Sequence, residues 1–236
     1  MSPHVTEARF LNDVANHAMT VIRDDGVYRH IQFRRPGTVN YRFDLLTWPG
    51  HLAITGDMGT YVFSRLQDMF EFFRTDRIHG RNDGRTLFVN PGYWGEKLVS
   101  VCPCGGYRRY DADVFRQRVQ AHFDSWVERR ALPDAMASEP EIENFEQGKN
   151  DLWDAIESDV LSFADYGEID AYSVVRDFFY NGFEFVDFFD AGGTESYTFS
   201  YLWCIYAIAW GVARYDEAAN SSAAVAERST NLSKLL

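Results

Sequence analysis

The feature that most constrains this chain is a stretch, residues 134–195, that is both strongly acidic and rich in aromatic rings. It holds 17 Asp+Glu and only two bases, Lys149 and Arg176. An acidic run with few rings is typically a solvated, disordered tail. This one contains twelve Phe, Tyr and Trp residues, which are enough to supply a core. We therefore expect it to fold with its rings inside and its carboxylates at the surface.

Charge is divided unevenly along the 236 residues, whose net charge is −12. Residues 1–110 carry 14 Lys+Arg and 11 Asp+Glu, a net +3, whereas residues 111–236 carry 9 and 24, a net −15. Crowded carboxylates repel one another and destabilise a compact state. Solubility explains acidic surfaces in general. A surface made to meet a basic partner explains the concentration into one segment, and both explanations stay open here.

Apolar periodicity predicts an α+β fold with an N-terminal antiparallel β-meander and flanking helices, followed by an all-helical acidic C-terminal half. The expected subdomains are 1–106 and 107–236, with one continuous domain as the alternative. A first helix is expected from Pro3 through Val14 and Ile22 to a stop at Gly26. Strands are expected at residues 27–35, 39–45, 51–55 and 60–63, with a tight turn at 56–59.

Helical spacing continues through the second half. The apolar positions that define three helices are Phe115, Val119, Phe123 and Trp126; Leu152, Ile156, Val160 and Phe163; and Ile169, Tyr172, Val175, Phe179, Phe183 and Val186. The uncharged run Ser196–Ala213 has 18 residues, near the lower limit for a bilayer span, but several polar side chains favour a buried helix. No secretory signal is visible at the N-terminus and only three cysteines are present, so we expect a cytoplasmic location without membrane contact.

One segment, FDLLTWPGHLAITGDMGTYVFSRLQDMFEFFR (Phe43–Arg74), resembles a signature of uncharacterised proteins encoded in phages and prophages of proteobacteria. No activity is assigned to that family, so the resemblance carries over no catalytic residue. It implies a context, in which small accessory proteins often disarm host defences, as anti-CRISPR proteins do. That step is an association and not a derivation from this sequence.

Candidates for acid–base chemistry near this signature are His51, Asp57, Asp44 and His79. Gly and Asp at residues 56–59 are also what a tight turn requires, and we favour the turn. Cys102 and Cys104 form a Cys-x-Cys segment, whereas zinc sites usually need four ligands from paired knuckles. We therefore expect no metal site and no cofactor, and the role of the Trp48–Arg65 segment stays open beyond a hairpin scaffold.

The favoured hypothesis is a non-enzymatic inhibitor whose acidic surface occupies the basic nucleic-acid groove of a host defence protein or nuclease complex in the host cytoplasm. Its expected contact residues are Glu139, Glu141, Glu143, Glu146, Asp151, Asp154, Glu157, Asp165, Glu168, Asp170, Glu184 and Asp187. The surplus of +3 in the first half is too small to favour direct nucleic-acid binding. The alternatives are a small hydrolase using His51 and Asp57, and a phage structural or assembly protein. A homodimer, with the basic half docked on the acidic half of another copy, also stays open.

Overall fold

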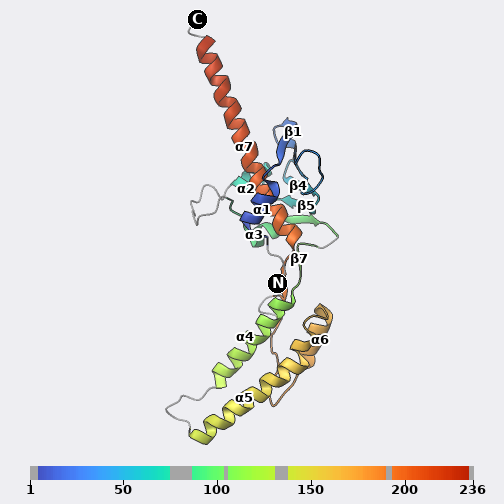
Figure 1. The fold of residues 1–236 in the computed structure, drawn as a ribbon, viewed down its shortest axis with the longest axis vertical. Helices are drawn as coiled ribbons and strands as arrows, with labels where there is room; N and C mark the ends of the chain where they lie inside the picture. Colours follow the sequence, from blue (N-terminus) through green and yellow to red (C-terminus); the bar gives the residue numbers. More distant parts are fainter. Residues whose placement is uncertain (1–4, 75–86, 104–105, 131–137, 190–192, 234–236) are drawn as a thin grey trace. The chain divides into compact units, whose positions relative to one another are not determined.

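The computed structural model describes residues 5–74, 87–103, 106–130, 138–189 and 193–233, with side chains in the last range as far as Ser221. It shows the predicted α+β fold, with a six-stranded antiparallel sheet followed by helices (Figure 1). The chain forms two compact units. The helical unit is Arg109–Ser196, and the β-rich unit comprises Ser2–Arg108 and Tyr197–Leu236.

The sheet of the β-rich unit is a simple meander in which each strand pairs with the next one in sequence. Its strands are β1 (Ala18–Asp25), β2 (Tyr28–Arg34), β3 (Phe43–Trp48), β4 (His51–Gly56), β5 (Gly59–Ser64) and β6 (Leu98–Val101). Short turns join β1 to β2, β3 to β4 and β4 to β5, whereas the connection from β5 to β6 contains helices. Inward positions of the central strands are fully buried, and they alternate with partly exposed ones, as expected for a sheet covered on one face.

The first predicted helix is wrong beyond Val14. Helix α1 spans only Glu7–Val14, with the Thr6 side chain accepting from the Arg9 N–H at its start. The chain then forms strand β1, because the β-branched run Thr20–Ile22 pairs readily with β2 and the turn at Gly26, at φ 60°, closes the hairpin. The apolar residues that looked helical therefore belong to two elements.

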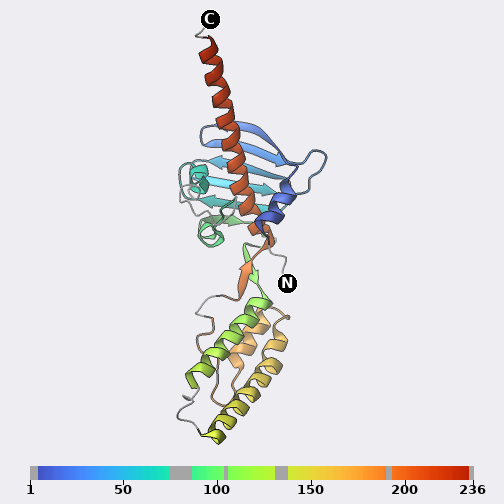
Figure 2. The same ribbon diagram turned by 60° about the vertical axis from the view of Figure 1, so that its left-hand side comes forward.

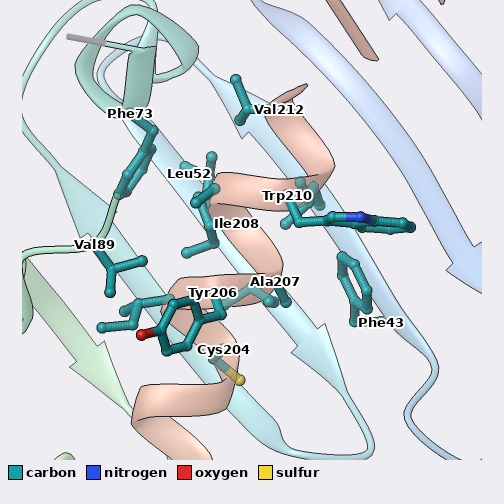
Figure 3. Close-up of a cluster of buried hydrophobic side chains, with 14 of the residues drawn as sticks. Phe43, Leu52, Phe73, Val89, Cys204, Tyr206, Ala207, Ile208, Trp210 and Val212 are labelled. Atoms are coloured by element: carbon teal, nitrogen blue, oxygen red, sulfur yellow. The ribbon is translucent and has the colours of Figure 1, made fainter. Parts of the chain in front are cut away.

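Helix α7 (Phe199–Ser233) runs across one face of the sheet (Figure 2). Its apolar N-terminal half buries Trp210 and Ile208 against strand side chains such as Phe43 and Leu52 (Figure 3). Helices α2 (Met69–Arg74) and α3 (Pro91–Gly95) add further residues to this core. The predicted buried helix at Ser196–Ala213 is thus confirmed from Phe199 onward, and no helix among the described residues is long and apolar enough to cross a membrane.

Gly211 sets how closely α7 approaches the sheet. A Cβ atom at this position would lie 2.7 Å from Leu45 Cδ1 and 3.2 Å from two carbons of the Phe33 ring. Both side chains are fully buried, so neither can move aside without disturbing the core. Glycine is therefore required here by packing, although it weakens a helix.

We expect Gly211→Val to destabilise the β-rich unit by about 1–3 kcal/mol, because added methyl groups overpack a filled core. Gly148→Ala is the matched control, since a Cβ there meets nothing within 4 Å and alanine favours the helix. Urea denaturation followed by circular dichroism measures both. A valine variant as stable as the wild type would show that the helix does not depend on this close approach.

The helical unit has a core of its own. Its helices are α4 (Ala112–Arg130), α5 (Glu139–Asp159), the 3₁₀ turn η2 (Leu161–Phe163) and α6 (Glu168–Asp177). The core forms where α4 buries Phe115, Val119 and Phe123 together with Leu152 and Ile156 of α5. The predicted α4 face is thus confirmed, and the α5 face is confirmed as far as Val160. The prediction is wrong for Phe163, which lies in η2 and is 39% exposed. Helix α6 ends at Asp177 and residues 178–189 lack regular helix, so Phe179 and Val186 are exposed rather than part of a buried helix face.

The chain is divided differently from the predicted subdomains 1–106 and 107–236. Strands β7 (Arg108–Tyr110) and β8 (Glu195–Tyr197) pair with each other where the chain leaves and re-enters the β-rich unit. Helix α7 belongs to that unit because its apolar side chains complete the core beside the sheet. Hydropathy indicated that this helix is buried, but only the tertiary structure shows that it packs against the sheet of the β-rich unit.

Candidate acidic interaction face

The division into units sharpens the charge asymmetry of the chain. The helical unit holds 7 Lys+Arg and 21 Asp+Glu, a net charge of −14, whereas the β-rich unit holds 16 and 14, a net +2. All of the protein's surplus negative charge is thus carried by the smaller unit. That unit would repel nucleic acid and attract basic surfaces.

The carboxylates of this unit point to solvent. Fifteen of the 17 acids in residues 134–195 are described, and all fifteen residues are exposed. The twelve predicted contact residues are among them: Glu139, Glu141, Glu143, Glu146, Asp151, Asp154, Glu157, Asp165, Glu168, Asp170, Glu184 and Asp187. The expectation of carboxylates outside an apolar core is confirmed for every described acid of this stretch.

Helix α5 arranges five of these acids in one row. Successive members of the row are three, four or eight residues apart, which are helical repeats, so they share one face of the helix. The five residues are Glu139, Glu143, Glu146, Asp154 and Glu157. We call these five residues the α5 row. The buried positions Leu152 and Ile156 lie on the opposite side of the helix. At 1.5 Å per residue the row is about 27 Å long, the rise of about eight nucleotides in a DNA strand.

Few described cations neutralise the row. Lys149 pairs with Glu146, and no other described Lys or Arg forms an ion pair with the α5 row. Glu157 accepts a hydrogen bond from Trp153 Nε1 at 2.8 Å. The row is therefore fixed by a folded helix while most of its charge remains available to a partner.

Glu141 has a different role from its neighbours, because it caps the helix. Its carboxylate accepts from the Ser138 N–H at 2.9 Å and from the Ser138 hydroxyl at 2.6 Å. These hydrogen bonds favour the charged form and lower the pKa of Glu141 below its ordinary value. The structure thus assigns this predicted contact residue to the start of α5.

Of the six other predicted contact residues, Asp151 lies on α5 outside the row and accepts a hydrogen bond from Gln147, and the remaining five form two separate groups, so the twelve do not share one face. Asp165, Glu168 and Asp170 surround the start of α6, and Asp165 pairs with Arg116 of α4. Glu184 and Asp187 line a hollow together with His122, Arg129 and Arg130. Burial lowers the pKa of His122, which keeps its ring neutral at neutral pH.

The signature segment has structural roles that explain its composition. Gly56 pairs with Gly59 across the predicted turn, and a Cβ on Gly56 would lie 2.1 Å from the Arg42 carbonyl oxygen. Asp57 accepts from the Tyr41 N–H at 2.8 Å, and its own N–H donates to Arg42. The turn is therefore confirmed, and the Trp48–Arg65 segment contains the β4–β5 hairpin of the sheet.

The predicted acid–base candidates do not meet in one site. His51 begins strand β4 and Asp57 follows its end, which places them about 20 Å apart at 3.3 Å per residue. The His51 ring stacks on Trp48 with centroids 5.1 Å apart. Asp44 instead accepts from His30 Nε2 at 2.7 Å, a pair formed by neighbouring strands that strand periodicity alone did not reveal. His79 lies outside the described residues.

The cysteines show no metal geometry in the part of the chain that is described. Cys102 is partly exposed, Cys104 lies outside the described residues, and Cys204 is buried in the core of the β-rich unit. Burial raises the pKa of the Cys204 thiol, so it stays protonated and inert. No group of three or more His, Cys, Asp or Glu side chains suited to a metal ion occurs among the described residues.

Comparison of this chain with protein-family models, curated proteins and solved structures gives no match. The phage-family resemblance of Phe43–Arg74 therefore stays a prediction. Any function has to be argued from the geometry and charge of the chain itself.

The α5 row should cost stability, because each carboxylate repels neighbours one turn away. Glu143→Gln and Asp154→Asn each remove a charge with acidic neighbours on both sides. We expect each to raise the midpoint of thermal unfolding by roughly 2–5 °C at low salt, and we expect the gain to vanish near 1 M salt. Differential scanning calorimetry at both ionic strengths checks this.

Glu141→Ala on the same helix should have the opposite effect, because it removes the side-chain acceptor that caps the helix. A carboxyl whose pKa is lowered by folding stabilises the protein above its ordinary pKa and loses that effect as the pH falls through the lowered one. The wild type and this variant should therefore differ at pH 7, and the difference should shrink as the pH falls below the ordinary glutamate pKa and vanish below the lowered one. Stabilisation by Glu141→Ala at pH 7 would contradict the capping role.

Proposed function

We propose that this protein is a binding protein that blocks a basic, nucleic-acid-binding groove of a partner protein. The observation that supports it best is the α5 row, five exposed carboxylates on a folded helix within a unit of net charge −14. Neighbours in the row lie one helical turn apart, about 5–6 Å, except for a two-turn gap between Glu146 and Asp154, and this spacing is comparable in scale to that of phosphates along a strand. A groove built for phosphates would accept such a row.

The electrostatic term acts at two stages of binding. At a distance, the negative unit steers a positive surface toward it and raises the association rate on the order of ten- to a thousandfold. In contact, the carboxylates pair with Lys and Arg side chains that otherwise hold phosphates. Nucleic acid is then excluded from the groove, because the carboxylates of this protein already occupy the Lys and Arg side chains of the partner that would bind phosphates.

The narrower form of the proposal is an anti-CRISPR-like inhibitor of a host defence complex, acting in the host cytoplasm. It is supported by the resemblance of Phe43–Arg74 to phage and prophage proteins, which is an association and not a geometric argument. The binding mode and the biological target are therefore tested separately.

The binding mode is tested by capture from a proteobacterial lysate on the immobilised full chain, with mass-spectrometric identification. The test variant replaces the α5 row by amides: E139Q, E143Q, E146Q, D154N and E157Q. The matched control removes five exposed acids elsewhere: E71Q, E96Q, D124N, E128Q and E195Q. Both variants have the same net charge of −7.

We expect the wild type and the control to capture a basic protein at 50 mM salt and to release it at 500 mM, because salt screens exposed charges. The α5-row variant should bind it at least tenfold more weakly. Addition of the wild type should also displace an oligonucleotide from the purified partner. Equal capture by both variants, or binding that is insensitive to salt, would refute the proposed mode.

The biological target is tested in cells by phage plating on a strain with CRISPR immunity against that phage. Expression of the wild type should restore plating by orders of magnitude, and the α5-row variant should not. Unchanged immunity with the wild type would reject the anti-CRISPR form and leave the binding mode to the capture experiment.

A further inference from the structure

The helical unit leaves a group of large apolar side chains uncovered at η2 and α6. Tyr166 is 73% exposed, Ile169 83%, Tyr172 47% and Phe163 39%. They recur every third residue along the chain, and the Phe163 and Tyr166 rings contact each other with centroids 5.7 Å apart. We call these four residues the α6 ring patch. Uncovered apolar surface of this kind typically marks an interaction site.

The sequence pattern had placed Ile169 and Tyr172 in the core, and that is wrong. Helix α6 instead buries Ala171 and Val175, so it approaches its neighbours through a small residue and turns Ile169 and Tyr172 outward. Tyr172 is held from one side by Phe189, with stacked rings 4.4 Å apart. Its position is thus fixed while nearly half of its surface stays accessible.

Carboxylates lie beside these rings. Glu168 and Tyr172 are one turn apart on α6 and share a face. Asp165 and Asp170 flank Tyr166 and Ile169 in the sequence. The chain has no Lys or Arg between Lys149 and Arg176, and no described Arg or Lys stacks on a ring of the α6 ring patch. Arg176, one turn after Tyr172, is paired with Asp177, and Phe189 covers one face of the Tyr172 ring. The patch therefore combines negative charge with ring surface on which no described cation stacks.

Another part of this protein contains a carboxylate beside an aromatic ring, and there the pair binds a guanidinium group. In the β-rich unit, Asp68 holds the Arg29 guanidinium with two hydrogen bonds of 2.9 Å, and the Phe70 ring lies 4.7 Å from its Cζ. Burial raises the pKa of Asp68, but the hydrogen bonds from Arg29 and the Phe70 N–H outweigh it, so that pKa lies below its ordinary value. A carboxylate next to an aromatic ring is thus a guanidinium site in this fold.

We propose that the α6 ring patch is an arginine-binding surface, which holds guanidinium groups of the basic partner between its rings and the carboxylates of Glu168 and Asp170. This inference rests on the proposed function and specifies its partner further. A guanidinium is planar and stacks on a ring while donating to a carboxylate, whereas a lysine ammonium is a compact, strongly hydrated charge. The surface therefore selects arginine over lysine, in addition to attracting positive charge.

Two fluorescein-labelled probe peptides test this on the full chain by fluorescence anisotropy. One contains eight Arg-Gly-Gly repeats and the other eight Lys-Gly-Gly repeats, so their charge and length match. We expect the arginine peptide to bind about three- to tenfold more tightly, since each exposed ring adds roughly a two- to fivefold preference. Both affinities should fall with salt because the carboxylates attract either peptide.

The test variant is Tyr166→Leu with Tyr172→Leu, which keeps apolar bulk and removes the ring faces. It should bring the ratio of the two affinities close to one. The control is Tyr28→Leu in the β-rich unit, a tyrosine 44% exposed whose ring is already occupied by Arg23 at 5.2 Å. This control should leave the ratio unchanged. Circular dichroism confirms that the variants are folded.

The outcomes separate this inference from the proposed function. If both peptides bind equally with strong salt dependence, or if the ring variant keeps the preference, the arginine surface is refuted and the electrostatic binding mode stands. If neither peptide binds, the electrostatic mode fails and this inference fails with it. Concentration-dependent dimers in light scattering that Ile169→Ser abolishes would assign the patch to a second copy of this chain, which also refutes the inference.

Discussion

The helical unit depends on a balance between its apolar core and the mutual repulsion of its carboxylates. Seven bases face 21 acids in this unit, and the described ion pairs neutralise only a few of those acids. The core formed by α4, α5 and α6 has to outweigh that repulsion. A fold under this constraint keeps its acids at the surface, because burying an unpaired carboxylate would cost far more than exposing it.

This balance also explains why the exposed rings are informative. A unit that needs apolar burial for stability leaves Tyr166 and Ile169 largely in water. Apolar side chains that contribute little to the core and stand beside carboxylates are typical of contact residues at interfaces. In the proposed binding mode, the α5 row supplies long-range attraction and the α6 ring patch supplies short-range selectivity.

Much of the β-rich unit was predictable, and the errors have local causes. The turns at Gly50 and Gly59 were predicted because only glycine readily adopts their φ values of 79° and 103°. The first helix was extended too far because residues 18–25 are compatible with either period. The pairing of His30 with Asp44 could not be predicted, since it depends on the register between two strands. The sequence predicted which acids are exposed, but it did not predict that they divide into the α5 row, the start of α6 and the hollow beside His122.

The sequence alone determined the α+β class, the segregation of charge and the exposure of the acids, because these follow from composition and from the cost of burying charge. The tertiary structure decided that α7 completes the core of the β-rich unit, which requires Gly211 to let the helix approach Leu45. It also decided which side of α6 faces water, because the helix packs through Ala171. Both outcomes depend on how closely two elements pack, and a one-dimensional pattern of polar and apolar residues does not contain that distance.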